Sequence, residues 1–272
     1  MISTIGIIGS GGIGGVVAEL AAAAGYEVIV SNSRGPASLQ RQVERLGPKA
    51  RAATVEEAAA GGDLVVVATP LGAYDGLPVE ALRGKVVVDM MNYYPVREGQ
   101  IAELDRGELT SSEMVQRHLA GAKVVKALHN QDAPHLLINA RPDIDERRTT
   151  LPVSGDDSDA KRLVIRLLER IGYNAVDAGS LADSWRLEPG SPIYVWPYAP
   201  EVPAGLSGEE TELFYVAIRG KPFGIEEARQ RIAKAVRPER IGGYPEDLPS
   251  TWVAIVGHWS EIVHRAARPS TG

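Results

Sequence analysis

The first half of the chain alternates short apolar runs with longer stretches in which apolar and polar residues mix. The runs, such as 63–68 and 85–89, are rich in valine and carry apolar residues at consecutive positions. Consecutive apolar positions are typical of strands that are buried on both faces. We therefore predict an α/β fold with a doubly wound parallel sheet. The predicted strands cover 5–8, 26–30, 51–53, 63–68, 85–89 and 123–127, and the helices between them include 16–24, 38–46, 55–60 and 112–119.

The second half begins with a polar connection at 141–148 and then changes its pattern. An amphipathic helix at 159–171 lies between two further strands, 150–154 and 173–177, which predicts a smaller C-terminal α/β domain. The predicted boundaries are 1–140 for the first domain and 149–272 for the second. The second domain ends in a helical extension, and its further helices cover 181–187, 208–219, 225–236 and 249–266.

Residues 189–203 differ from the rest of the second half. They contain five prolines together with Tyr194, Trp196 and Tyr198. Proline excludes an ordinary helix or a central strand here, so the segment should be irregular. The sequence leaves three roles open for it: lining a substrate pocket, wrapping a neighbouring subunit, or covering the surface.

A glycine turn joins the first predicted strand to the first predicted helix. Its three patterned glycines occupy the G-x-G-x-x-G positions. The first allows a tight turn, the second lets the backbone approach a pyrophosphate, and the third lets the helix pack on the strand. The free N–H groups at the helix start then face the phosphates. We predict a Rossmann domain that binds a dinucleotide through Gly9, Ser10, Gly11, Gly12, Ile13 and Gly14.

The end of the second predicted strand favours NADP(H) over NAD(H). A domain that binds the unphosphorylated cofactor places an acid here to hold the ribose 2′-hydroxyl. This chain instead has hydroxyls, an amide and a guanidinium, which suit a 2′-phosphate. The loop could also simply cap the next helix. The predicted phosphate-binding residues are Ser31, Asn32, Ser33 and Arg34.

Further candidates follow the later strands, because ligands bind at the carboxyl ends of the strands in open α/β sheets. We expect the nicotinamide to contact Thr69, Pro70, Leu71 and Asn92. His129 and Tyr93 are the candidate catalytic residues, since either could donate a hydrogen bond or a proton to a substrate. Each also has a purely structural alternative: His129 could bond to the backbone, and Tyr93 and Tyr94 could be packing residues.

Composition excludes several other classes of function. The 272 residues carry a net charge of −6, so no basic surface indicates a nucleic-acid partner. The chain has no cysteine, and its five histidines show no metal-binding spacing. No apolar run is long enough to span a membrane. No basic region precedes the first strand, so we expect no signal peptide and a cytoplasmic protein.

Several segments resemble the NADP-dependent oxidoreductases of the coenzyme F-420 (8-hydroxy-5-deazaflavin) type. Besides the glycine turn, the resemblance rests on "SNSRGP" at 31–36, "VVVATPLGAY" at 65–74, "VVVDMMNYYP" at 86–95 and "AKVVKAL" at 122–128. It continues through "VSGDDSDAK" at 153–161 and "DAGSLADSW" at 177–185. The similarity thus covers about residues 3–188.

The resemblance implies a Rossmann domain, a smaller C-terminal domain, a homodimer, and hydride exchange between NADPH and a deazaflavin-type coenzyme in the cleft. It places the phosphate-binding serine and arginine of the family on Ser31, Ser33 and Arg34. The chain departs from the family at Leu128 and His129, where phenylalanine and asparagine are usual. Two alternatives stay open: a reductase of an imine, enone or other small biosynthetic intermediate, and a non-catalytic NADPH-sensing protein.

Overall fold

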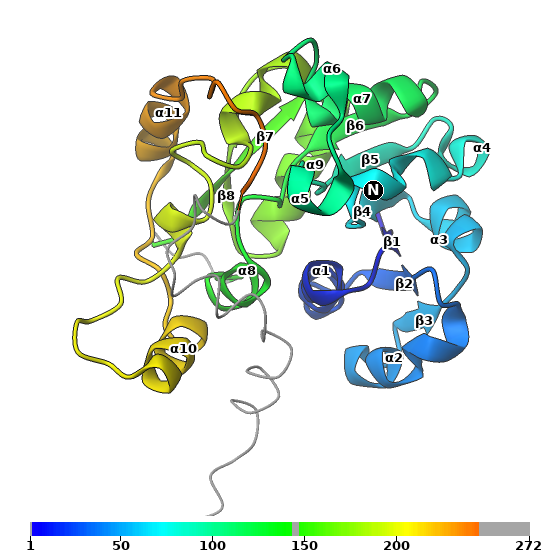
Figure 1. Cartoon of the computed structure of the whole chain (residues 1–272). Helices are drawn as coiled ribbons and strands as arrows, with labels where there is room; N and C mark the ends of the chain where they lie inside the picture. The colour runs from blue at the N-terminus through cyan, green and yellow to red at the C-terminus, as the bar shows by residue number, and fades with distance from the viewer. Residues whose placement is uncertain (1, 143–146, 245–272) are drawn as a thin grey trace, which may run out of the picture.

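A single eight-stranded sheet forms the centre of the protein in a computed structural model that describes residues 2–142 and 147–244 (Figure 1). The strand order is β3-β2-β1-β4-β5-β6-β7-β8, and all neighbours are parallel except β6 and β7. The strands are β1 (Thr4–Ile8), β2 (Glu27–Ser31), β3 (Ala50–Ala52), β4 (Leu64–Val67), β5 (Val86–Asp89), β6 (Lys123–Lys126), β7 (Thr150–Gly155) and β8 (Asn174–Asp177).

Helices cover both faces of this sheet, as the apolar runs predicted. The α-helices are α1 (Gly12–Ala23), α2 (Gln40–Leu46), α3 (Val55–Gly61), α4 (Val79–Leu82), α5 (Pro95–Glu98), α6 (Ala102–Asp105), α7 (Ser111–His118), α8 (Ala133–Ile138), α9 (Ser158–Arg170), α10 (Gly208–Ala217) and α11 (Ile225–Ala233). Four 3₁₀ segments are η1 (Pro36–Leu39), η2 (Leu71–Gly76), η3 (Leu181–Leu187) and η4 (Trp196–Tyr198).

Alternate residues of each strand enter two different cores. In β4, Leu64 and Val66 pack with α1, α8 and α9, whereas Val65 and Val67 pack with α3, α4 and α7. Successive side chains of a strand point to opposite faces, so one apolar run supplies both cores. The doubly wound sheet is therefore confirmed.

The sheet reverses its order of winding between β1 and β4. β1 pairs with β2 on one side and with β4 on the other, so the chain crosses the sheet in opposite directions from this point. Connections that diverge in this way leave a crevice at the carboxyl ends of the strands. The glycine turn follows β1 and Thr69 follows β4, so both border this crevice.

The two predicted domains share one sheet. β7, which follows the polar connection, pairs with β6 at Val125–Gly155 and Lys126–Ser154. β8 then extends the sheet, and α9 packs on both new strands. The division at 140–149 stays a prediction, but the core is continuous across it.

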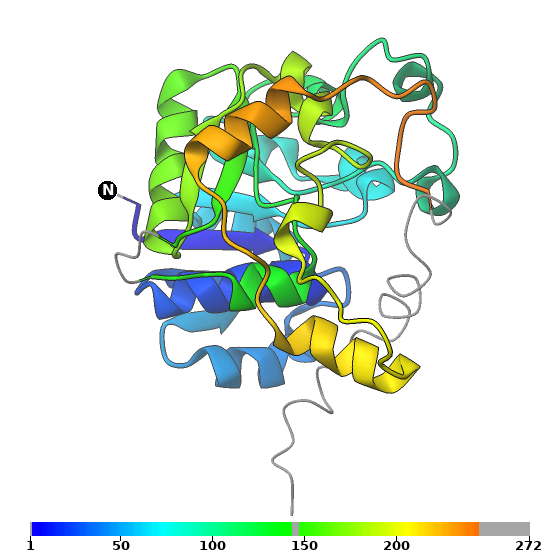
Figure 2. The same ribbon diagram turned by 90° about the vertical axis from the view of Figure 1, so that its left-hand side faces the viewer.

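The C-terminal extension packs on the same body (Figure 2). α11 contacts β7 and β8, whereas α10 contacts α8. Both helices are shorter than predicted, and η3 is a 3₁₀ segment where we expected an ordinary helix. The predicted helix at 249–266 lies outside the described residues.

Candidate functional site

The glycine turn leaves an open space at the start of α1. Gly11 is the N-cap residue, and a Cβ atom placed on it would meet no atom within 4 Å. Gly9 has a φ of +93°, and a Cβ on Gly14 would lie 2.0 Å from the Gly9 carbonyl oxygen. The buried hydroxyl of Ser10 has no hydrogen-bond partner among the described residues. Unpaired donors beside an open backbone fit a phosphate group.

The loop after β2 exposes two of its four predicted phosphate-binding residues. Ser33 and Arg34 are exposed, and Asn32 shapes the loop by accepting from the Arg34 N–H at 2.9 Å and donating to the Ser38 hydroxyl at 3.0 Å. Ser31 is fully buried, and its hydroxyl donates to the Ile7 carbonyl at 2.8 Å. Ser31 is therefore a structural residue of the sheet, and its assignment as a phosphate ligand was wrong.

A cleft of about 240 Å³ runs from the glycine turn to the loop after β6. Its lining includes Ile13, which follows β1, and His129, which follows β6, together with Tyr194. Thr69, Pro70 and Asn92 line it between them, which brings together candidates from four separate loops. This is the arrangement expected for a ligand that extends across the carboxyl ends of the strands.

Two of the residues predicted at the nicotinamide end do not face the cleft. Leu71 is fully buried in the core beneath α4 and α7. Tyr93 is 1% exposed; its hydroxyl donates to Asp105 at 2.7 Å and accepts from the Ile101 N–H at 2.8 Å. Burial raises the pKa of Tyr93 to about 12. The assignment of Tyr93 as a catalytic residue was wrong, and the adjacent Tyr94 lines the cleft in its place.

A chain of hydrogen bonds crosses the nicotinamide end of the cleft. The Asn92 amide donates to the His129 carbonyl at 3.2 Å and to the Tyr194 hydroxyl at 3.3 Å. Its oxygen lies 3.0 Å from His129 Nδ1, and the Tyr194 hydroxyl bonds to that of Tyr94. Nε2 of His129 is buried without a partner among the described residues. The wall of the cleft thus contains an imidazole ring and two phenols.

Burial keeps these groups uncharged. Desolvation, reinforced by the charge of Lys126, holds the pKa of His129 well below its usual value. Desolvation likewise raises the pKa values of Tyr94 and Tyr194. Because burial disfavours the charged form of each group, the imidazole and both phenols are neutral at pH 7.

The backbone is strained on both sides of this network. Leu128 has a φ of +62° and Val195 a φ of +54°, and they are the two non-glycine residues of the described chain with positive φ. They directly adjoin His129 and Tyr194. The Val195 N–H donates to the Asn130 carbonyl at 2.8 Å, which ties the two segments together. Strain of this kind persists only where surrounding contacts enforce it, and it clusters at functional sites.

The residues of the cleft that sequence reasoning did not single out include Arg97, Gln131 and Asp132. Asp132 caps α8 and accepts hydrogen bonds from His135 Nδ1 at 2.7 Å and from the Tyr215 hydroxyl at 2.7 Å. Tyr194 comes from the proline-rich segment, whose role as a pocket wall was one of three open alternatives.

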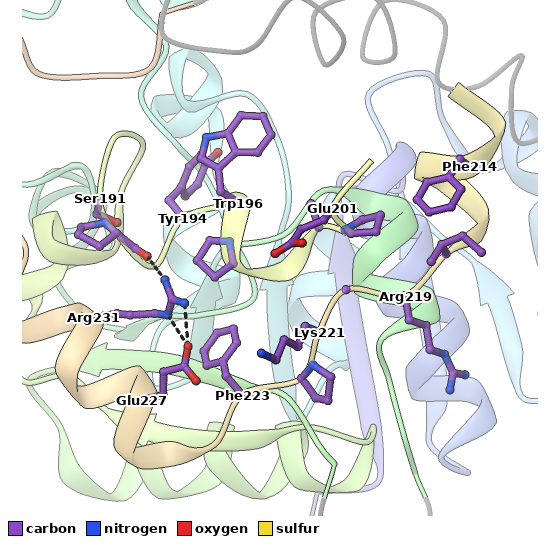
Figure 3. Close-up of a pocket in the computed structure, with 17 residues that line it drawn as sticks. Ser191, Tyr194, Trp196, Glu201, Phe214, Arg219, Lys221, Phe223, Glu227 and Arg231 are labelled. Carbon is purple, nitrogen blue, oxygen red and sulfur yellow. Dashed lines mark hydrogen bonds and ion pairs between the residues drawn. The ribbon is translucent and has the colours of Figure 1, made fainter. Parts of the chain in front are cut away.

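The proline-rich segment also lines a second cavity of about 730 Å³, beneath Trp196 and between Arg219 and Arg231 (Figure 3).

Two other kinds of site are absent from the described part of the chain. No three histidine or acidic side chains within 2–142 and 147–244 could hold a metal ion. No helix in the same ranges is long and apolar enough to cross a membrane.

Comparisons with known proteins agree with this geometry. Residues 4–93 match the family described as NADP oxidoreductase, coenzyme F420-dependent. The metalloreductase STEAP3 of Rattus norvegicus is 27% identical over 186 residues, which are 68% of this chain. The chain spans about a third (35%) of the length of that curated relative.

Solved structures extend the similarity beyond the first domain. A hypothetical protein, SMa0349 of Sinorhizobium meliloti, is 34% identical with a TM-score of 0.63, covering 71% of this chain and 93% of that one. A candidate F420-dependent NADP reductase of Arthrobacter sp. is 26% identical with a TM-score of 0.58, covering 68% and 87%. Residues 4–93 therefore carry the domain of the family described as NADP oxidoreductase, coenzyme F420-dependent, within a chain of Rossmann-type fold.

Proposed function

We propose that the protein transfers a hydride between NADP(H) and a deazaflavin-type coenzyme bound in the cleft. The observation that carries this proposal is that one cleft is lined both by Ile13 of the glycine turn and by His129 and Tyr194. A dinucleotide whose phosphates contact the turn would therefore present its nicotinamide to the polar end. The second reactant would approach from the side of the proline-rich segment.

The phosphate end suits NADPH. Gly11 and the start of α1 would hold the pyrophosphate, and the exposed Ser33 and Arg34 would hold the 2′-phosphate. No carboxylate stands at the end of β2 to repel that phosphate.

The nicotinamide end would orient the reactants. Bound NADPH would supply the hydride itself. Asn92 and His129 line this end together with the hydrogen-bonded Tyr94–Tyr194 pair, so a carboxamide there would lie beside polar side chains. Alignment of the two reactants would account for much of the rate of such a transfer.

An anaerobic assay tests this proposal directly. The protein is mixed with NADPH and oxidised deazaflavin, and the absorbance of both is followed. We expect the two to change in equal molar amounts. Measurable NADPH binding without any deazaflavin turnover would rule the proposal out.

A second candidate function is the reduction of an imine or a carbonyl-conjugated alkene. It is favoured by the two phenol hydroxyls in the cleft, since such acceptors need a proton as well as a hydride. The departure at Leu128 and His129 lies at this end. A panel of cyclic imines and enones, assayed with NADPH, separates the two candidate functions.

We also propose that the protein forms a homodimer, as the resemblance implies.

Replacing Arg34 with alanine should reduce the preference for NADPH. Charge-assisted hydrogen bonds contribute about 1.5–3 kcal/mol, so we expect NADPH to bind roughly 10- to 100-fold more weakly. NADH binding should not change, because it lacks the 2′-phosphate. Fluorescence titration of both cofactors measures this, with Arg229→Ala on the distant α11 as the matched control. An equal loss of affinity for NADPH and NADH would show that Arg34 does not bind the 2′-phosphate.

A further inference from the structure

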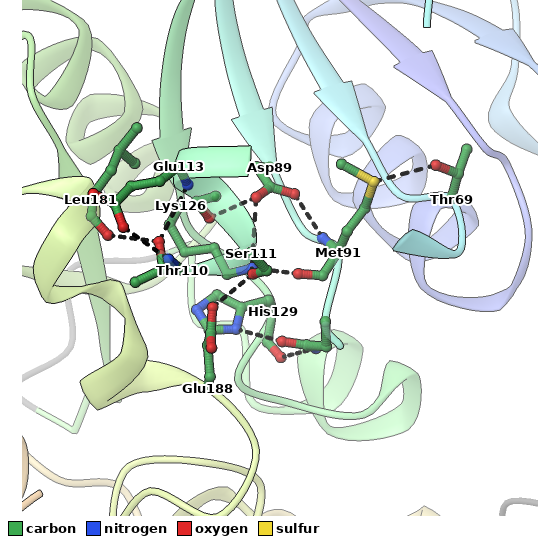
Figure 4. A network of polar contacts seen from close by, with 12 residues as sticks. Thr69, Asp89, Met91, Thr110, Ser111, Glu113, Lys126, His129, Leu181 and Glu188 are labelled. Carbon is green, nitrogen blue, oxygen red and sulfur yellow. Dashed lines mark hydrogen bonds and ion pairs between the residues drawn. The ribbon is translucent and has the colours of Figure 1, made fainter. Parts of the chain in front are cut away.

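Two oppositely charged side chains lie fully buried behind the cleft, where hydride transfer does not use them directly (Figure 4). Asp89 ends β5 and Lys126 ends β6; both side chains are 0% exposed, and Lys126 Nζ lies 3.5 Å from Asp89 Oδ2. A buried ion pair seldom stabilises a protein more than well-packed apolar residues would. Its presence here indicates another role.

The pair holds a single residue from both sides. Asp89 Oδ1 accepts a hydrogen bond from the Met91 N–H at 2.9 Å, and the Lys126 ammonium donates to the Met91 carbonyl. The peptide groups before and after Met91 are therefore both fixed. Asn92 is the next residue, so its position depends on these two bonds.

The remaining bonds of the pair reach the opposite wall of the cleft. Lys126 Nζ also donates to the Ser111 hydroxyl at 3.2 Å, and that hydroxyl donates to Glu188 at 2.6 Å. The Ser112 hydroxyl donates to Asp89 Oδ2 at 2.6 Å. Glu188 directly precedes the proline-rich segment that carries Tyr194. One buried network thus connects the segment that carries Asn92 with the segment that carries Tyr194.

Asn92 in turn selects the tautomer of His129. Its amide nitrogen donates to the His129 carbonyl and to Tyr194, so its oxygen faces His129 Nδ1 and must accept. In the neutral imidazole the hydrogen is then on Nδ1, and Nε2 is a buried acceptor.

The titratable groups around His129 are few. Lys126 lies behind it on β6, the Tyr194 ring centroid lies 6.5 Å away, and Tyr94 and Asp132 line the same cleft. Burial first, and the Lys126 charge second, oppose protonation of the imidazole. The network therefore acts on His129 through both geometry and charge.

We propose that the Asp89–Lys126 pair positions the nicotinamide end of the cleft by fixing Met91, and thereby fixes Asn92 and the Nδ1–H tautomer of His129. These are positioning residues, since neither lines the cleft. The consequence for turnover rests on the proposed function, whereas the consequence for the tautomer does not.

The test replaces the pair by apolar residues of similar size, Asp89→Leu with Lys126→Met. The tautomer is observed by ¹⁵N NMR of imidazole-labelled protein, with the His129 signals assigned by comparison with His129→Gln. We expect the wild type to show the Nδ1–H form and the double variant a mixture of tautomers. We also expect kcat to fall about 100-fold, the scale of a small misplacement at a reacting centre. Binding of 2′,5′-ADP, which probes only the phosphate end, should stay unchanged.

Lys161→Met is the matched control, because Lys161 also pairs with a carboxylate and a carbonyl but lies on α9, away from the cleft. It should change neither the tautomer nor kcat. Ser111→Ala is a milder second variant that keeps both charges, and we expect it to broaden the His129 signals and lower kcat about tenfold.

A wild-type tautomer in a folded double variant, or in Ser111→Ala if the double variant does not fold, would overturn the proposal. Absence of turnover in the wild type with every acceptor would instead contradict the proposed function. The NMR experiment would still test whether the ion pair fixes the tautomer of His129.

Discussion

Gly11→Val is expected to lower the affinity for NADPH by about 100-fold or more, a loss of about 2.8 kcal/mol, without destabilising the fold. The Gly11 φ of −73° is ordinary for any residue, and a Cβ there would meet no protein atom within 4 Å. The same open space is where the pyrophosphate would approach the backbone. A side chain in it should therefore exclude the ligand and little else.

Fluorescence titration with NADPH and thermal unfolding without it measure the two effects separately. Gly208→Val on α10 is the matched control, because a Cβ on Gly208 also meets nothing within 4 Å. Gly14 could not serve for this test, since its Cβ would collide with the Gly9 carbonyl and disturb the fold itself. Wild-type NADPH affinity in Gly11→Val would place the pyrophosphate elsewhere.

The sheet could be predicted from the sequence because strands buried on both faces need consecutive apolar residues. The run Leu64–Val67 supplies alternate side chains to two cores, and no other element of that length would bury all four. The start of α3 could also be predicted from the sequence. Thr54 accepts from the Glu57 N–H at 3.2 Å and Glu57 bonds back at 2.9 Å, which is the capping box that their spacing allows.

The error at Ser31 came from the end of a strand. The apolar run stops at Val30, but β2 continues for one more residue and pairs Ser31 with Ile8. A hydroxyl can be buried there because it donates to the Ile7 carbonyl. Periodicity does not reveal such a bond, so Ser31 resembled a loop residue.

The error at Tyr93 came from the direction of a side chain. Tyr93 and Tyr94 follow the same strand, and neighbouring residues of extended chain point to opposite sides. Tyr93 points into the core and reaches the half-buried Asp105, whereas Tyr94 reaches Tyr194, one hundred residues later in sequence. The partner that makes Tyr94 part of the cleft lies in an irregular segment, for which no periodic signal exists.

Lys126→Met alone is expected to destabilise the protein by about 3–5 kcal/mol, because it leaves the Asp89 carboxylate buried without a counter-charge. The double substitution with Asp89→Leu should recover most of this loss, since both charges then leave the interior together. Urea unfolding of the two variants and the wild type measures the difference. Lys161→Met should cost only about 0.2–1 kcal/mol, because its partner Asp177 is 52% exposed at the side chain.

Comparing Lys126→Met with the double variant separates an effect on stability from an effect on the position of cleft residues. If the pair served the stability of the sheet, the double variant would remain as unstable as Lys126→Met, and its loss of turnover would need no further cause. If it serves the cleft, the double variant regains stability while Met91 loses both of its anchoring bonds, so that Asn92 and His129 are free to rearrange in a protein that is otherwise intact. A stable double variant with impaired transfer is therefore the result that only the positioning role predicts.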